Sequence, residues 1–308
     1  MKQLILHHYP LSPFAEKIRL ILGFKGLQWS SVIIPNMMPK PDLTALTGGY
    51  RKTPVMQIGA DVYCDTALIA DVIEAEAPRP TLYPGGIAAA SRTLAQWADS
   101  TLFWTAIPFT LQPAGLAVMF EGVPAETVKA FGDDRNAFRA NIPRTRPADA
   151  TAAFALYLER LEEMLGTQDF FFGPAASIAD FSIYHSLWFV LRGGPVAKIL
   201  ESFPALQGWR ARVSAFGHGT LEKLSSTAAI SIAHDAAAEP SVGTSGDSHG
   251  ISMGEKVIVA ATDTGTEPIE GTLYGVTKNR ISIAREDPRA GTVVVHFPRL
   301  GFELRRAK

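Results

Sequence analysis

The residue best placed for chemistry in this sequence is Ser12, which stands between a short apolar run and the start of an amphipathic helix. Serine is a good helix N-cap, and Pro13 suits the first helical position, where its missing N–H costs nothing. Phe14, Ile18 and Ile21 recur at helical spacing, with charged residues on the other face. Free backbone N–H groups and the helix dipole favour an anion there. The pattern therefore indicates a place that could hold a thiolate, although Ser-Pro before such a run is also an ordinary cap.

The next residues contain the elements that must position this serine. In chain order the pattern predicts strands over residues 28–34, 52–58 and 61–64, and then a helix over 66–77. Only two residues separate the last two strands, so we expect them to form a hairpin. The helix begins at an acidic and hydroxyl pair, Asp65 and Thr66, which are typical capping residues.

This order of elements resembles the thioredoxin-like domain of the glutathione transferases. Residues 12–19 are similar to the family's active-site loop and first helix, in the classes that use Ser or Cys at that point. Thr53 and Pro54 resemble the residue and cis-proline that pair with the backbone of glutathione's cysteine. Asp65 and Thr66 resemble the pair that receives the γ-glutamyl end. A thioredoxin-type thiol–disulfide exchanger would instead need cysteine at position 12.

The resemblance implies how glutathione would be held. A hydrogen bond from the Ser12 hydroxyl would stabilise the thiolate, because an unperturbed thiol is only a few per cent ionised at neutral pH. The Thr53 backbone, ahead of a cis Pro54, would pair with the cysteinyl N–H and C=O. Asp65 would take the γ-glutamyl ammonium, and Thr66 would take its carboxylate at the helix start.

Three cations and two histidines complete the set of candidate ligand-binding residues. Lys52 is the first candidate for the glycyl carboxylate, with Lys40 and Arg51 as weaker ones, although a solvated surface lysine has the same pattern. His7 and His8 could suggest a metal. Neighbouring strand residues face opposite sides, however, and no third ligand is evident, so we predict no metal.

Composition narrows the function only broadly. The 308 residues have 47% hydrophobic side chains and a net charge of −1, which argues against a general nucleic-acid or membrane-surface binder. No cleavable apolar leader and no long apolar run is evident, so we expect a cytoplasmic protein. The single cysteine, Cys64, excludes an intramolecular disulfide and a Cys-x-x-Cys centre. Its place at a strand end favours a packed core thiol over a nucleophile.

The middle of the chain has helical periodicity. Residues 87–120 predict a helix that breaks or kinks at its prolines, and two tryptophans in it suit a core or the wall of an electrophile cleft. Residues 121–150 are polar and interrupted by proline, which predicts an elaborated connection between helices. Ser177 and Asp180 form a capping box similar to that of a core helix in the family's helical domain. We therefore expect Asp180 to be structural.

A third unit follows a linker. Residues 233–250 are small and polar, without an apolar period. After residue 250 the period changes to two, as at Val257 and Val259, and turn clusters recur. Four or five short strands predict a small antiparallel, barrel-like module. Its nine Lys and Arg against seven Asp and Glu are too slight an excess to indicate RNA or DNA. The resemblance, which covers about residues 1–220, gives this module no role.

The sequence thus predicts a multidomain protein. The expected parts are a thioredoxin-like glutathione-binding domain over 1–80, an all-helical domain over 85–232, a linker over 233–250 and a β module over 251–308. The resemblance implies a homodimeric glutathione-dependent transferase that activates the thiol for attack on a small electrophile. Conjugation, isomerisation, dehalogenation and peroxide reduction stay open. The alternative is a non-catalytic protein of this fold that acts as a binding or interaction module through its β tail.

Overall fold

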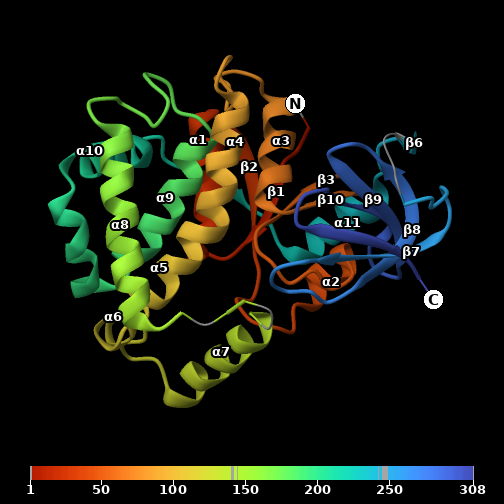
Figure 1. Ribbon diagram of the computed structural model, residues 1–308. Helices are drawn as coiled ribbons and strands as arrows, with labels where there is room; N and C mark the ends of the chain where they lie inside the picture. Colours follow the sequence, from red (N-terminus) through yellow and green to blue (C-terminus); the bar gives the residue numbers. More distant parts are fainter. Residues whose placement is uncertain (1, 140–141, 144, 242, 245–248, 308) are drawn as a thin grey trace.

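The computed structural model describes residues 2–139, 142–143, 145–241, 243–244 and 249–307. Figure 1 shows the helical bundle on one side, the strands of the N-terminal region in the middle and the C-terminal strands on the other side. The fold is a thioredoxin-like domain followed by a helical domain, with an additional C-terminal module rich in antiparallel strands. The expected fold class is therefore confirmed.

The N-terminal region contains the strands and helices that the sequence predicts. These are β1 (Ile5–His8), α1 (Pro13–Phe24), β2 (Gln28–Ile33), α2 (Pro41–Thr47), β3 (Val55–Ile58), β4 (Asp61–Cys64) and α3 (Thr66–Glu76). Strand β1 runs parallel to β2 and antiparallel to β3, and β3 and β4 form the expected hairpin. As a result the C-terminal end of β1 and the N-terminal end of β3 lie at the same edge of the sheet.

The second region is almost wholly helical. Its elements are α4 (Ala88–Trp97), a π-helical segment (Ala98–Leu102), α5 (Phe103–Thr110), α6 (Pro113–Met119), α7 (Ala125–Phe138), α8 (Pro147–Leu165), α9 (Ile178–Leu191), a 3-10 segment (Gly194–Ser202) and α10 (Pro204–Ser214). The first long helical stretch breaks before Pro113, whereas α5 accommodates Pro108. The capping box of Ser177 and Asp180 is confirmed, and Asp180 also accepts a hydrogen bond from Trp209.

The prediction that residues 121–150 are only an elaborated connection is wrong for α7, which is a regular helix. This helix has fourteen residues, none of which is buried. Helical periodicity is visible in a sequence when one face is clearly apolar, whereas the large apolar residues of α7, Val128, Phe131 and Phe138, are few and only partly buried. Figure 1 shows α7 apart from the rest of the bundle, below α2 in that view.

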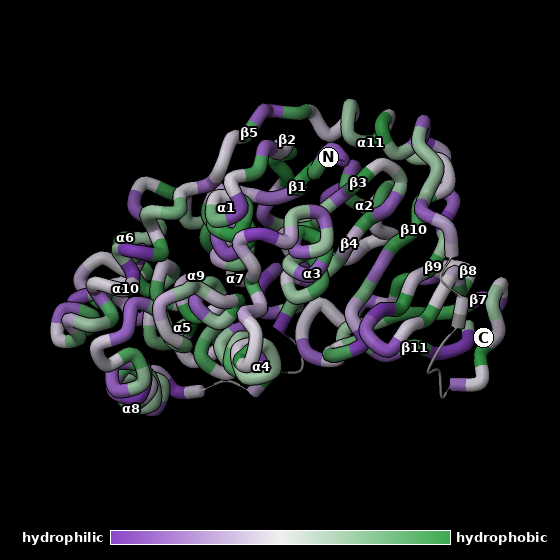
Figure 2. The backbone as a smooth tube through the Cα atoms, turned by 90° about the horizontal axis from the view of Figure 1, so that it is seen from above, coloured by the Kyte–Doolittle hydropathy of each residue, from purple (hydrophilic) through white to green (hydrophobic). Residues whose placement is uncertain are grey.

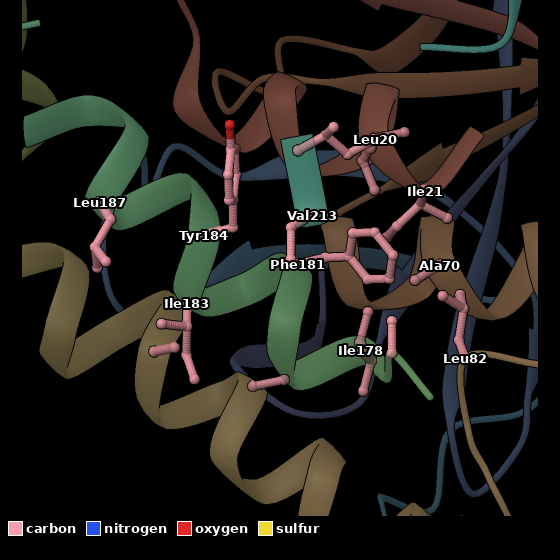
Figure 3. Close-up of a cluster of buried hydrophobic side chains, with 14 of the residues drawn as sticks. Leu20, Ile21, Ala70, Leu82, Ile178, Phe181, Ile183, Tyr184, Leu187 and Val213 are labelled. Atoms are coloured by element: carbon pink, nitrogen blue, oxygen red, sulfur yellow. The ribbon is translucent and has the colours of Figure 1, made fainter. Parts of the chain in front are cut away.

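Helix α9 is the centre of the bundle and packs against α1. Most of its residues are buried, including the polar Asp180 and His185 beside the apolar ones, which is typical of a helix enclosed by its neighbours. Figure 3 shows Phe181 of α9 pointing toward Leu20 and Ile21 of α1, and all three residues belong to one buried hydrophobic cluster. The face of α1 opposite the sheet therefore has no access to solvent, which explains why Lys17 in it is 0% exposed.

The C-terminal strands extend the sheet of the N-terminal region. They are β7 (Lys256–Ala261), β8 (Ile269–Val276), β9 (Arg280–Asp287), β10 (Gly291–Pro298) and β11 (Phe302–Arg306), joined as an antiparallel series. Strand β10 then runs parallel to β4, with His296 opposite Tyr63. Two short strands join elsewhere: β5 (Thr220–Lys223) pairs with β2, and β6 (Gly243–Thr244) pairs with β8. In the described residues all of these strands except β6 form one path from β5 to β11 (Figure 2).

The module shares a hydrophobic core with the first region. One cluster combines Ile5 and Val55 of the N-terminal sheet with Val257 and Val295 of the module. Helix α11 (Ser226–Asp235) packs against α2 and β10 and so covers the junction. The module therefore closes the edge at β4, which would otherwise present unpaired backbone groups. The domain boundaries stay predictions.

No single helix in the described residues is long and apolar enough to span a membrane. Two consecutive segments, 88–110 and 113–119, meet the requirement together by length and composition, but they are bent by 88°.

Candidate functional site

Ser12 lies at the N-terminus of α1, as the sequence predicts. Its side chain accepts a hydrogen bond from the Ala15 backbone N–H at 3.2 Å, so the serine is an N-cap. A hydroxyl group has one proton to donate and two lone pairs, so capping leaves the proton available for another partner. Ser12 is only 2% exposed, and a ligand would therefore contact it over a small area. From the helical domain, Arg192 donates to the carbonyl of Leu11 at 2.9 Å and fixes the loop.

The bond between Thr53 and Pro54 is cis, which confirms the prediction. Thr53 lies just before β3, outside its paired residues, and no backbone hydrogen bond to another described residue is recorded for it. The Thr53 hydroxyl accepts a hydrogen bond from the Lys40 ammonium at 3.1 Å. Thr53 is half-buried, and its backbone is thus not committed to another strand at this edge.

Asp65 and Thr66 lie at the N-terminus of α3, the second helix start at this edge. The Asp65 carboxylate accepts from the Ala67 N–H at 2.9 Å. With φ of 77° and ψ of 135°, Asp65 is the one residue other than glycine with positive φ among those described. Such a backbone conformation costs about 1–3 kcal/mol and is typical of functional sites. Burial raises the pKa of the Asp65 carboxyl, while the charge of Lys52 acts in the opposite direction.

A buried lysine connects the starts of α1 and α3. The Lys17 ammonium donates to the Thr66 hydroxyl at 3.2 Å and to the Asp99 carboxylate at 2.6 Å. Because an ammonium only donates, the Thr66 proton must point to a different acceptor. Asp99 belongs to the π-helical segment of the helical domain and also contacts His185 at 2.9 Å. Burial would raise the pKa of Asp99, but Lys17 and His185 outweigh it and hold that pKa below its ordinary value.

The cations proposed for the glycyl carboxylate have different surroundings. Lys52 donates to Asp263 of the C-terminal module at 2.5 Å. Arg51 forms ion pairs with Asp134 of α7 at 2.8 Å and with Glu267 of the module at 2.5 Å. Lys40 has hydrogen bonds only to uncharged oxygens, those of Thr53 and of the Arg51 carbonyl, in the part of the chain described. Burial, and then the charge of Arg135, lowers the pKa of Lys40 to about 8.

The remaining candidates have structural surroundings. Cys64 is buried, and burial raises its thiol pKa well above the ordinary value. His7 bonds to Gln57 at 2.9 Å, whereas His8 bonds to Ser31 at 2.9 Å. No group of three or more possible metal ligands occurs in the residues that the structure describes.

Several residues of this arrangement could not be recognised in the sequence. Lys17 occupies the charged side of an amphipathic helix, which ordinarily faces solvent, and Asp99 is a single acid in a helical stretch. Asp134 lies in a segment predicted to be a connection, and Asp263 and Glu267 lie in a predicted turn cluster. The one signal in the sequence was the cluster of charged residues in the first turns of α1. It does not indicate which residues those charges would contact.

Fold and site together define a class of protein: a thioredoxin-like domain with two helix N-termini and an accessible backbone edge, covered by a helical domain. Residues 6–81 match the glutathione S-transferase N-terminal domain, and residues 136–212 match the glutathione S-transferase C-terminal domain. A GST-like protein from Pseudomonas syringae, known from its crystal structure, has 47% sequence identity to this chain. The match covers all of both chains, with a TM-score of 0.81. The chain belongs to the glutathione transferase family.

Two more distant relatives show how far the likeness extends. FtsZ-localized protein A of Caulobacter vibrioides is 26% identical over 182 residues, which is 58% of this chain and 72% of the relative. A glutathione S-transferase from Rhodospirillum rubrum is 20% identical, with 69% of this chain and 88% of the other covered and a TM-score of 0.52. The latter likeness concerns the fold alone.

Proposed function

We propose that this protein binds glutathione and stabilises its thiolate for attack on a small electrophile. The observation that carries the proposal is the pair of helix N-termini at one edge of the sheet, α1 with Ser12 and α3 with Asp65 and Thr66. The bond from Lys17 to Thr66 joins them. Both helix starts favour anionic groups, and glutathione has a thiolate and a γ-glutamyl carboxylate to place there.

Each part of glutathione has a partner in this proposal. Ser12 donates a hydrogen bond to the sulfur, and the Thr53 backbone ahead of Pro54 pairs with the cysteinyl residue. Thr66 and Asp65 hold the γ-glutamyl carboxylate and ammonium. The glycyl end then lies on the far side of Thr53 from α3. Lys40, Lys52 and Arg51 are the candidate cations for the glycyl carboxylate there, and Lys40 contacts Thr53 directly.

Binding and turnover test this proposal separately. Calorimetric titration with S-methylglutathione measures binding without thiol chemistry, and we expect saturable binding at one site per chain. Conjugation of glutathione to 1-chloro-2,4-dinitrobenzene, followed by absorbance, measures thiol activation. Absence of binding would overturn the whole proposal, whereas binding without turnover would overturn only the catalytic part. We further propose a cytoplasmic homodimer, as the family resemblance implies.

The second candidate function is a binding or interaction module. It is favoured by the likeness to FtsZ-localized protein A, whose name associates that protein with FtsZ. Co-sedimentation with polymerised bacterial FtsZ tests this candidate. Co-sedimentation without glutathione turnover would favour the module over the enzyme.

A further inference from the structure

The loop between β7 and β8, residues 262–268, reaches from the C-terminal module to the candidate glutathione site. Its Asp263 accepts from Lys52 at 2.5 Å, and its Glu267 accepts from Arg51 at 2.5 Å. The Gly265 N–H donates to the Phe138 carbonyl of α7 at 3.0 Å, which fixes the loop at its centre. Two carboxylates of the module therefore form ion pairs with two of the three cations proposed for the glycyl end.

These contacts change the charge that a ligand would meet. The side chains of Lys52 and Arg51 are 17% and 11% exposed, whereas those of Asp263 and Glu267 are 51% and 47% exposed. The carboxylates, rather than the cations, thus present more surface to a ligand that approaches this side. Lys40 alone, among these three cations, has no hydrogen bond to a carboxylate in the described residues.

Glutathione would bring its glycyl carboxylate to this side of the site, if it binds as proposed above. That carboxylate must then compete with Asp263 and Glu267 for the same ammonium and guanidinium groups. It also experiences repulsion from both carboxylates, because like charges a few ångströms apart disfavour each other. A glutathione derivative without the glycyl charge avoids this cost.

From this geometry we propose that Asp263 and Glu267 are specificity-determining residues for the glycyl end of the ligand. They weaken binding of a free glycyl carboxylate and so favour a glutathione derivative in which it is masked as an ester or amide. This inference rests on the proposed glutathione site. If the two ion pairs only held the module in place, the same contacts would be seen. Removing them would then change the affinities for charged and uncharged ligands equally.

The experiment compares glutathione with its glycyl monoethyl ester by calorimetric titration. The proteins are the full-length wild type and the double variant Asp263→Asn/Glu267→Gln. We expect the ratio of Kd for the ester to Kd for glutathione to rise about threefold to tenfold in the double variant, the effect of one or two exposed ion pairs. The change should come from tighter binding of glutathione, with ester binding unchanged.

Glu255→Gln provides the matched control. Glu255 is also a module carboxylate that bonds to an arginine, Arg306, but it lies at the other end of β7 from the loop. This variant should leave the ratio unchanged. If the double variant does not fold, Glu267→Gln alone gives the same readout, because Arg51 keeps Asp134 as a partner.

An unchanged ratio in the double variant, including equal weakening of both ligands, would overturn the inference and leave the loop as a clamp. A wild type that binds neither ligand would overturn the glutathione proposal itself. The two failures are distinguishable, because titration of the wild type alone shows whether the protein binds glutathione at all.

Discussion

At the scale of single residues, Ser12 shows that a helix cap and a thiolate donor need not be alternatives. The side chain uses a lone pair on the Ala15 N–H, which leaves its proton for a sulfur anion. Ser225, the exposed N-cap of α11, provides a control for the stability that a cap contributes.

We expect Ser12→Ala to lower turnover at neutral pH by tenfold or more and to raise the apparent pKa of bound glutathione. A hydrogen bond to a charged group contributes about 1.5–3 kcal/mol. The free energy of unfolding should fall by about 0.5–2 kcal/mol from loss of the cap. A pH–rate profile at matched folded concentration measures the first effect. Ser225→Ala removes the N-cap of α11 and should reproduce only the stability loss. Superimposed profiles for wild type and Ser12→Ala would leave Ser12 as a cap.

Lys40 leads to a prediction about pH. Because burial lowers its pKa to about 8, Lys40 is charged at pH 7 and largely neutral at pH 9. Affinity for S-methylglutathione should therefore fall as the pH rises through 8, by up to about tenfold beyond the effect of the ligand's own ammonium. Lys40→Arg keeps its charge and should lack this additional fall. Parallel curves for the two proteins would remove Lys40 from the site.

At the scale of elements, the contact of α1 with the π-helical segment joins the first domain to the helical domain. Lys17 is fully buried and has its counter-charge, Asp99, on the other domain. A buried ion pair is costly to break, because the remaining charge has neither water nor a partner.

Asp99→Asn should destabilise the protein by about 3 kcal/mol, the lower end for a broken buried pair, since Asp99 is partly exposed. It should also weaken glutathione binding, because Lys17 then no longer holds Thr66 in place. Urea unfolding and calorimetric titration measure the two effects. Asp235→Asn, at an exposed position, should change stability by less than about 0.5 kcal/mol. Equal stability of Asp99→Asn and wild type would contradict this account of Lys17.

At the scale of the whole molecule, buried histidines link stability to pH. Burial lowers the pKa of His7 to about 4, of His8 to about 3 and of His185 and His296 below the ordinary value. His296 bonds to Asp61 of β4 at 2.7 Å and to Ser282 of β9 at 2.8 Å, so it connects the module to the first region.

The sign of the effect follows from proton uptake. Below pH 6.5 the unfolded chain binds more protons at these histidines than the folded chain does, so stability is lost as the pH falls from 6.5 toward the folded pKa. Each histidine contributes up to about 1.4 kcal/mol per pH unit. His296→Gln should reduce the slope of unfolding free energy between pH 6.5 and 5.5, as measured by urea titrations. An unchanged slope would mean that His296 is protonated in the folded protein.

The quaternary structure is a further prediction at this scale. The family resemblance implies a homodimer in which the first domain of one subunit contacts the helices of the other. Light scattering at micromolar concentration should give the mass of two chains. A measured mass of one chain would contradict the dimer. The candidate glutathione site would then have to be formed by a single chain.

The sequence by itself determined the local structure and the positions of the candidate ligand contacts. Ser12 before Pro13, the hairpin before Asp65 and the capping box of Ser177 depend on neighbouring residues, and such short-range signals can be read directly. The cis bond at Pro54 followed from the family resemblance. Helix α7 was missed, because its few apolar residues, Val128, Phe131 and Phe138, give only a weak period among the charged ones.

Only the tertiary structure decided which distant charges meet. Lys17 pairs with Asp99, which is 82 residues away in the sequence, and Arg51 pairs with Glu267, which is 216 residues away. The parallel pairing of β10 with β4, which joins the module to the first sheet, is equally non-local. An ion pair or a strand pairing has no periodic trace in the sequence, since its partner is fixed by the path of the chain. For this reason the sequence predicted a module after a linker, whereas the fold brings two of its carboxylates to the candidate site.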